Sequence, residues 1–127
     1  MVAVTAAVIK RNGLVLIARR TDEILGGLWE FPGGKIEKDE SPEQCLKREL
    51  FEEFGITTVI GTHVVTNVHA YDHITIELQS YWVEHLDGEF ELRDHDKIAW
   101  VTPSDFERYE IAPADIPTVE AILSMER

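Results

Sequence analysis

The first 31 positions carry a pattern of apolar residues that predicts three strands. Residues 1–11 are rich in Val, Ala and Ile on both faces, as expected for a strand buried on both sides. Asn12-Gly13 is a strong signal for a two-residue hairpin turn, and the alternation over residues 14–19 predicts the returning strand. A loop is expected at residues 21–28, and residues 29–31 predict a short third strand.

The clearest helix signal lies between Ser41 and Gly55. Ser41 is a good N-cap, Pro42 occupies the first helical position, and Gln44 follows the cap by three residues, which makes a capping box. Gly55 is of the residue type that ends helices in the left-handed conformation. The apolar stripe expected to face the core consists of Leu46, Leu50 and Phe54.

The second half of the chain alternates between β-branched runs and turn signals. The predicted elements are a strand at 57–68, a turn at 69–73, a half-exposed strand at 74–82, a turn at 87–88, a short strand at 98–101, a short helix opening at 102–105 and a final helix at 113–125. In the final helix Val119, Ile122 and Leu123 are expected to face the core.

Three carboxylates share one face of the helix that begins after Ser41. Glu49, Glu52 and Glu53 are spaced i, i+3 and i+4, so their side chains are neighbours. Like charges at this spacing repel by roughly a few tenths of a kcal/mol per pair on an exposed helix, and a cation between them would reverse that cost. Oxygen-only ligands suit a hard ion such as Mg²⁺, or Mn²⁺ in its place. The alternative is an ordinary solvated helix face.

Nine residues around these glutamates follow a fixed spacing that resembles the Nudix box. The pattern is Gly34, five residues, Glu40, seven residues, Arg48-Glu49-Leu50, one residue, Glu52-Glu53, one residue and Gly55-Ile56. The preceding Trp29-Glu30-Phe31-Pro32 resembles the MutT-type branch of the same family. The resemblance implies an α+β fold, specifically an α/β/α sandwich with a mixed β-sheet between helices and a catalytic loop-helix-loop at residues 33–56.

The resemblance also implies roles for residues of the box. The metal ligands that it implies are the carbonyl of Gly33, which the flexible turn Pro32-Gly33-Gly34 could aim, and the carboxylates of Glu49, Glu52 and Glu53. Arg48 is the fourth catalytic residue and would position a glutamate through a salt bridge. Because adjacent helical residues point to different faces, the expected partner of Arg48 is Glu52 or Glu40 rather than Glu49.

A further metal-binding acid is expected from the loop before a late strand. Counting back from Trp100, Asp94 takes that place, and Asp96 is the fallback. The family often has glutamate at this position, and an aspartate reaches less far. The five histidines form no zinc-binding motif, and His69 and His73 are expected at the surface or at a pocket rim.

Four residues outside the helix are the expected substrate-binding positions, namely Arg20, Glu30, Phe31 and Asp115. The planar guanidinium of Arg20 suits phosphate or base contacts, and its alternative role is a solvated strand end. Phe31 matches a phenylalanine that lines the nucleoside pocket in the family, and its alternative role is packing in the core.

Asp115 is the candidate for base selection. It lies in the segment 111–117, IAPADIP, which matches the base-reading segment of MutT-like enzymes and closely resembles the CTP pyrophosphohydrolases among them. Members specific for 8-oxoguanine carry asparagine at this place. An ionised aspartate only accepts hydrogen bonds, which favours the exocyclic amine of cytosine. Oxidised guanine stays open because it offers extra N–H donors, and a helix cap is the alternative role for Asp115.

Composition and charge narrow the function classes. A chain of 127 residues fits one domain, and a formal net charge of −12 argues against binding to polymeric nucleic acid. A nucleotide substrate is still compatible, because a divalent metal can bridge carboxylates and phosphates. The chain has no apolar run long enough to span a membrane and no export signal. The single cysteine, Cys45, is expected to be a small packing residue, and this usage fits a reducing cytoplasm.

The resulting hypothesis is a Mg²⁺-dependent nucleoside triphosphate pyrophosphohydrolase that releases a monophosphate and pyrophosphate. A CTP or dCTP type of substrate, or a modified nucleotide, is expected, and 8-oxo-dGTP is the main alternative. A nucleotide-sugar or dinucleotide hydrolase is disfavoured by the short chain, and a silent nucleotide-binding module is disfavoured because every glutamate of the box is present. The expected partner is a small nucleotide, and the expected assembly is a monomer or a homodimer.

Overall fold

The computed structural model describes residues 1–125. Its elements are β1 (Val2–Arg11), β2 (Leu14–Arg20), β3 (Trp29–Glu30), β4 (Gly33–Lys35), α1 (Pro42–Phe54), β5 (Thr57–Ala70), β6 (Thr75–Asp87), β7 (His95–Val101), the 3-10 helices η1 (Pro103–Arg108) and η2 (Pro113–Asp115), and α2 (Ile116–Met125). No helix among residues 1–125 is long and apolar enough to cross a membrane.

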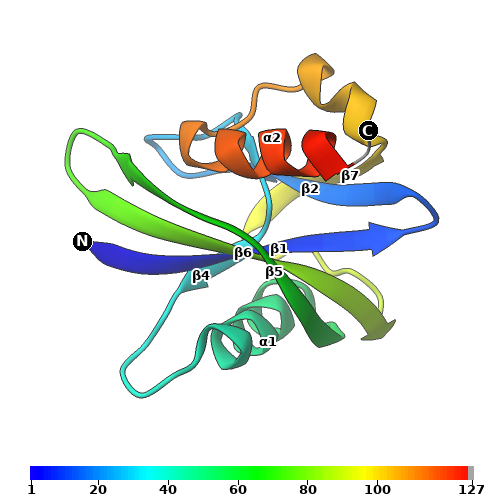
Figure 1. The fold of residues 1–127 in the computed structure, drawn as a ribbon. Helices are drawn as coiled ribbons and strands as arrows, with labels where there is room; N and C mark the ends of the chain where they lie inside the picture. The colour runs from blue at the N-terminus through cyan, green and yellow to red at the C-terminus, as the bar shows by residue number, and fades with distance from the viewer. Residues whose placement is uncertain (126–127) are drawn as a thin grey trace.

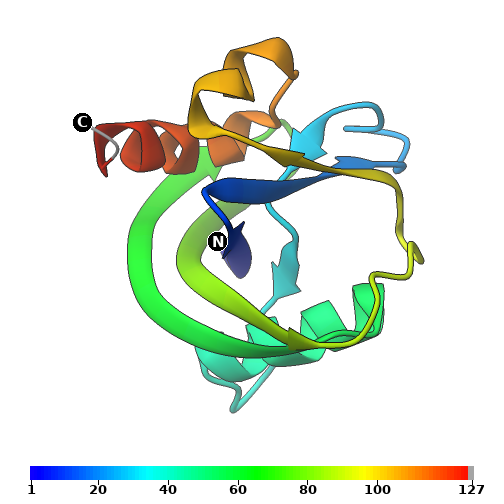
Figure 2. The same cartoon turned by 90° about the vertical axis from the view of Figure 1, so that its right-hand side faces the viewer.

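A mixed β-sheet lies between the two α-helices, with α1 on one side and α2 on the other (Figure 1). The strand order is β3-β2-β1-β6-β5, while β4 pairs with β1 and β7 pairs with β2. β1 and β6 are parallel, and the other pairs are antiparallel. The long β5–β6 hairpin curves around the molecule (Figure 2). This arrangement confirms the expected α/β/α sandwich.

Strand β1 separates two hydrophobic cores. Ala6 and Val8 belong to the core beneath α2, whereas Ala7 and Ile9 belong to the core above α1. All four side chains are completely buried, because successive residues of a strand point to opposite faces of the sheet. The apolar character of both faces of residues 1–11 is therefore explained by a helix on each side.

Helix α1 has the ends predicted from the sequence. The Ser41 hydroxyl accepts a hydrogen bond from the Gln44 amide at 3.1 Å, and the Gln44 side chain accepts one from the Ser41 amide at 2.8 Å. Gly55 ends the helix in the left-handed conformation, with φ of 72°, and its amide donates to the carbonyl of Phe51. The predicted stripe of Leu46, Leu50 and Phe54 is completely buried.

Several strands are longer than the sequence pattern predicted. β5 continues to Ala70, so the turn begins at Tyr71 instead of at His69, and β6 continues to Asp87. β7 begins at His95 because Arg20 of β2 pairs with it there, three residues before the expected start. Pairing with a neighbouring strand extends each element past the point where its own alternation is clear.

The C-terminal segment corrects two expectations. Residues 113–115 form a 3-10 turn, and the α-helix begins only at Ile116. Pro117 has no N–H to donate to the carbonyl of Pro113, which accepts from the amide of Ile116 instead. Val119 and Ile122 are buried as predicted, but Leu123 is exposed to solvent. The expectation that Leu123 faces the core was wrong.

Candidate active site

A cavity of about 470 Å³ brings together most of the site residues expected from the sequence. Those that line it are Arg20, Glu30, Phe31, Gly33, Glu53, Asp94 and Asp115. They come from β2, β3, the segment between β3 and β4, β4, α1, η2 and the segment before β7. Arg48, Glu49 and Glu52 of α1 form an ion-pair network close to Gly34, which also lines the cavity.

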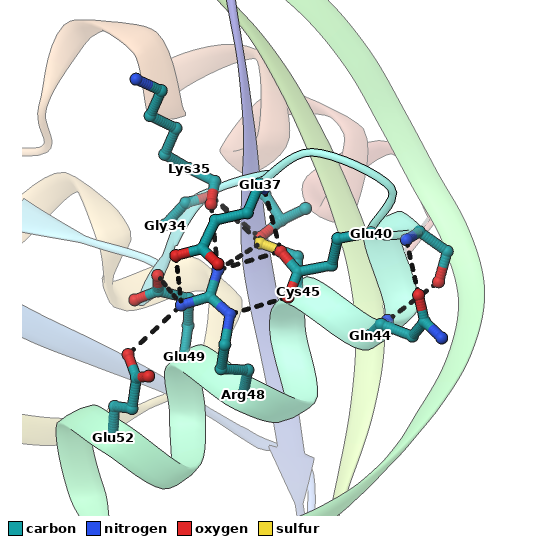
Figure 3. A network of polar contacts seen from close by, with 11 residues as sticks. Gly34, Lys35, Glu37, Glu40, Gln44, Cys45, Arg48, Glu49 and Glu52 are labelled. Carbon is teal, nitrogen blue, oxygen red and sulfur yellow. Dashed lines mark hydrogen bonds and ion pairs between the residues drawn. The ribbon is translucent and has the colours of Figure 1, made fainter.

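Arg48 is the centre of that network (Figure 3). Its guanidinium donates two hydrogen bonds to the Glu40 carboxylate, at 2.7 and 2.9 Å. It also contacts Glu52 at 3.2 Å, so both predicted partners are confirmed. The exclusion of Glu49 was wrong, because Glu49 accepts from the same guanidinium at 2.8 Å. The long arginine side chain reaches across the helix surface to its own neighbour.

The charge of Arg48 fixes the ionisation of Glu40. The hydrogen bonds from Arg48 lower the pKa of the Glu40 carboxyl to about 2. Neighbouring carboxylates in turn raise the pKa of the Arg48 guanidinium, Glu40 foremost and Glu49 next. Glu40 is therefore an ionised partner of Arg48, and Arg48 carries a fixed positive charge beside Glu49.

Gly33 and Gly34 are needed for close approach between chain segments. Both glycines belong to β4, a short strand that pairs with β1. Residues 33 and 34 therefore do not form the turn that was expected for Pro32-Gly33-Gly34. A Cβ on Gly33 would lie 2.0 Å from the backbone oxygen of Thr5, and a Cβ on Gly34 would lie 2.3 Å from the Glu49 carboxyl carbon. The missing side chain of Gly34 therefore makes room for the Glu49 carboxylate.

Glu53 is the buried carboxylate of α1. It is 6% exposed, and its Oε2 has no hydrogen-bond partner among the described residues. Burial raises the pKa of Glu53 to about 10, and the negative charges of Glu30 and Glu49 contribute further. A buried carboxyl in this state binds a proton at neutral pH unless a cation replaces that proton.

His95 belongs to the site, and sequence reasoning missed it. Its Nε2 lies 2.9 Å from Glu30 Oε2, and its Nδ1 lies 3.9 Å from Glu53 Oε2. Its ring stacks on Phe54 with centroids 5.4 Å apart and an interplanar angle of 8°. The sequence did offer one signal, because His95 directly follows the candidate metal ligand Asp94. The alternation of apolar and polar residues, however, predicted that the strand begins at Ile98, three residues after His95. His73 lies at the rim of a neighbouring cavity, as expected.

The other charged residues divide into those at the cavity and those outside it. Arg20 contacts Glu30 at 2.7 Å and Asp22 at 2.7 Å, so it is held by two carboxylates. Asp94 lines the cavity, whereas Asp96 is bound to Arg19 by two hydrogen bonds of 2.8 and 2.6 Å. The geometry therefore favours Asp94 over Asp96 as the additional acid.

Asp115 lies at the end of the cavity away from α1. It is 6% exposed, and its Oδ1 accepts a hydrogen bond from the amide of Phe31 at 3.3 Å. Burial raises the pKa of Asp115 well above its ordinary value, and the charge of Glu30 adds to the shift. The shift favours the protonated carboxyl, which can both donate and accept, over the ionised carboxylate, which only accepts. Burial therefore disfavours the ionised state on which the expectation for Asp115 was based.

The donor set fits a hard divalent cation. Oxygen atoms predominate at the α1 end, where the buried Glu53 Oε2 has no hydrogen-bond partner in residues 1–125 and Glu49 rests against Gly34. No three His, Cys, Asp or Glu side chains within those residues already converge in a metal-ligating arrangement. The carboxylates of Glu49 and Glu52 form ion pairs with the Arg48 guanidinium, and its positive charge balances part of theirs.

This helix, its glycine pair and its glutamates define a nucleotide-hydrolase type of site, and the comparisons agree. The sequence model described as NUDIX domain matches residues 4–121. The chain belongs to the NUDIX domain family and is a Nudix hydrolase. Members of the family use a divalent metal ion and act on small nucleotide substrates.

Relatives along nearly the whole chain carry names of nucleotide hydrolases. A CTP pyrophosphohydrolase of Escherichia coli K12 is 39% identical over 98% of this chain and 93% of its own. An 8-oxo-dGTP diphosphatase of the same organism is 30% identical over 87% of this chain and 85% of its own. The solution structure of the E. coli ORF135 protein is 38% identical, with a TM-score of 0.90 over 99% of this chain and 91% of its own.

A crystal structure of a MutT NUDIX hydrolase from Burkholderia pseudomallei has the same fold. It is 24% identical, with a TM-score of 0.87 over 95% of this chain and 97% of its own. At this level of identity the likeness concerns the fold alone.

Proposed function

We propose that this enzyme is a Mg²⁺-dependent nucleoside triphosphate pyrophosphohydrolase acting on CTP- or dCTP-type nucleotides, including modified ones. The observation that carries the proposal is one cavity lined by Glu53 at one end and by Phe31 and Asp115 at the other. The similarity to a CTP pyrophosphohydrolase over nearly the full chain supports the choice of base. The whole chain would act as one domain in the cytoplasm, as a monomer or a homodimer.

The α1 end would hold the triphosphate through the metal. The carbonyl of Gly33, the carboxylates of Glu49, Glu52 and Glu53, and Asp94 are the groups that would bind Mg²⁺. When bound, the ion neutralises phosphate charge and activates water. Arg48 keeps the Glu49 carboxylate beside Gly34 and so preserves the site between turnovers.

The polar pair of Arg20 and Glu30 would orient the substrate between the two ends. Glu30 accepts from Arg20 through one oxygen and contacts His95 through the other, so both neighbours limit its movement. The remaining donors of the guanidinium suit a phosphate or sugar oxygen. Arg20 would therefore bind and orient the nucleotide, whereas His95 would hold Glu30 in place.

Asp115 would select the base at the far end. A neutral carboxyl donates through its O–H and accepts through its carbonyl oxygen. Cytosine offers the matching pair, an acceptor at its ring nitrogen and a donor at its exocyclic amine. The Phe31 amide holds one oxygen of Asp115 in place, and the Phe31 ring packs beneath the site.

The second candidate is 8-oxo-dGTP diphosphatase activity. It is favoured by the raised pKa of the buried Asp115, because a carboxyl that keeps its proton can donate as well as accept, as the asparagine expected in 8-oxoguanine-specific members does. A relative with that named activity is 30% identical over most of this chain.

The deciding experiment is a kinetic panel with Mg²⁺ over CTP, dCTP, 5-substituted dCTP, GTP, dGTP and 8-oxo-dGTP, ranked by kcat/KM. Phosphorus NMR of the products should show a monophosphate and pyrophosphate. Release of inorganic phosphate would contradict the reaction. Preference for 8-oxo-dGTP over every cytidine nucleotide would replace the first candidate by the second.

A further inference from the structure

The short turn that carries Asp115 is fastened by two side chains of β5 and the turn that follows it. The amide of Ala114 donates a hydrogen bond of 3.0 Å to the Tyr71 hydroxyl, and the Asn67 side-chain amide donates one of 3.2 Å to the Ala114 carbonyl. Ala114 is 2% exposed, so water has almost no access to its backbone groups. A buried N–H that loses its acceptor costs about 1–3 kcal/mol.

Tyr71 is itself well fixed. Its amide donates to the Ile74 carbonyl at 2.8 Å across the β5–β6 turn. Its ring meets the His69 ring edge-on, with centroids 4.4 Å apart. Tyr71 lines both the active-site cavity and a neighbouring cavity of about 610 Å³. The hydroxyl is therefore held where the curved hairpin meets the nucleoside end of the site.

A chain of contacts connects this hydroxyl to the base-selecting group. Tyr71 holds Ala114, Ala114 precedes Asp115 in a 3-10 turn, and Asp115 is oriented by the Phe31 amide from the other side. The turn is also anchored at its start, because the amide of Ala112 donates to the Trp29 carbonyl. Removal of the hydroxyl would leave Asp115 held by the Phe31 amide, while on the hairpin side only the Asn67 hydrogen bond to the Ala114 carbonyl would remain.

We propose that Tyr71 is a positioning residue for substrate selection, which fixes the Asp115 carboxyl through the backbone of Ala114. The inference rests on the proposed role of Asp115 in choosing the base. Hydrogen-bond selection depends on atomic placement, and a displacement of about 1 Å can cost about 10²-fold in rate. Loss of the Tyr71 hydroxyl should change the preference between bases, whereas phosphate hydrolysis depends on the residues at the α1 end.

The test compares Tyr71→Phe with the matched control Tyr81→Phe. Each variant loses one phenol oxygen, but Tyr81 lies in β6 and packs with the core on the α1 side. The kcat/KM values for CTP and 8-oxo-dGTP are measured with Mg²⁺, and their ratio is the readout. Tyr71→Phe should reduce the wild-type ratio about tenfold, chiefly through KM of the preferred nucleotide. Tyr81→Phe should leave the ratio unchanged.

Two further measurements separate positioning from general stabilisation. In the Asp115→Asn background, Tyr71→Phe should change the ratio far less than in the wild type, because the two residues act as one unit. The amide NMR signals of Ala114 and Asp115 should shift in Tyr71→Phe and stay in place in Tyr81→Phe. A lower Tm with an unchanged ratio, or fully additive effects, would overturn the proposal. A wild-type enzyme without base preference would instead overturn the proposed function.

Discussion

The two ends of the active-site cavity are assembled in different ways. At the α1 end, Arg48 binds Glu40, Glu49 and Glu52, which lie at most eight residues away in the sequence. At the nucleoside end, Phe31 contacts Asp115 across 84 positions, and Tyr71 contacts Ala114 across 43. The ion pairs of α1 are thus encoded in one continuous stretch, whereas the contacts that hold Asp115 depend on long-range packing.

The electrostatics of the two ends also differ. The α1 end gathers carboxylates around a fixed cation, Arg48, and burial raises the pKa of its buried member Glu53 to about 10. At the nucleoside end, burial raises the pKa of Asp115 well above its ordinary value. One end is therefore suited to charged phosphates and metal, and the other to the uncharged edge of a base.

The largest expected effect is the loss of turnover in Glu53→Gln. Glutamine keeps the size of the side chain but cannot provide a carboxylate for metal or water, so kcat should fall by about 10²–10⁴-fold. Because Glu53 is protonated in the metal-free fold, circular dichroism of the variant without metal should match the wild type. Isothermal titration with Mn²⁺ should show weaker binding. Full activity in Glu53→Gln would remove this glutamate from the catalytic end.

Substitutions at Gly33 and Gly34 should separate an effect on stability from an effect on activity within the α1 end. A methyl group on Gly33 collides with the Thr5 backbone, so Gly33→Ala should markedly lower the free energy of unfolding. A methyl group on Gly34 meets only the end of the Glu49 side chain, which can swing away. Gly34→Ala should therefore fold normally and lose activity. Urea titrations and kcat measurements on both variants test this, and equal destabilisation would contradict it.

Asp115→Asn should act on base preference more than on rate. Asparagine places a nitrogen that only donates where aspartate has an oxygen that can also accept, so the ratio of kcat/KM for CTP and 8-oxo-dGTP should shift by about tenfold. Phosphate hydrolysis depends on the other end of the cavity, so kcat for the better substrate should change less. An unchanged ranking of the two nucleotides would remove Asp115 from base selection.

The same variant gives a test by pH. The folded-state pKa of Asp115 is raised, so the native protein keeps a proton that the unfolded chain releases, and stability falls as pH rises above the ordinary aspartate range. Asparagine has no such proton. The Tm of Asp115→Asn relative to wild type should therefore be higher at about pH 7 than at about pH 4. A difference in Tm that is independent of pH would mean that folding does not shift the pKa of Asp115.

The smallest expected effect is that of Arg48→Lys. Lysine keeps the charge but cannot make the forked contact with Glu40 while reaching Glu49 and Glu52. The activity should fall several-fold, and Tm should fall by only a few degrees, because lysine keeps the charge and partly exposed ion pairs are screened by solvent. Arg108→Lys, at an exposed pair with Asp105, is the control and should change neither. A loss as large as that of Glu53→Gln would show that Arg48 itself takes part in the chemistry.

The sequence was most informative where structure is local. The ends of α1 are marked by Ser41, Gln44 and Gly55, whose hydrogen-bond partners lie only a few residues away. Both ends of the helix could therefore be predicted from the sequence. Asn12 and Gly13 both adopt positive φ, of 52° and 80°, as the hairpin signal required. The burial of both faces of β1 followed from its continuous apolar pattern.

The sequence was least informative where contacts are distant or where burial changes charge. The place of His95 beside Glu30 and Glu53 depends on the pairing of β7 with β2, which no local pattern encodes. The raised pKa of Asp115 depends on its burial, and burial of a charged residue type is not visible in a sequence. The Arg48–Glu49 contact depends on how a flexible side chain bends.

Strand β1 has a consequence for how the molecule loses its structure. Its even-numbered side chains Ala6 and Val8 belong to one core, and its odd-numbered side chains Ala7 and Ile9 belong to the other. Neither layer can come apart without exposing the shared strand, so the helix that carries the glutamates and the turn that carries Asp115 belong to one cooperative unit. The layer of α1 and the layer of η2 and α2 therefore melt together, and neither can be exchanged as a separate module.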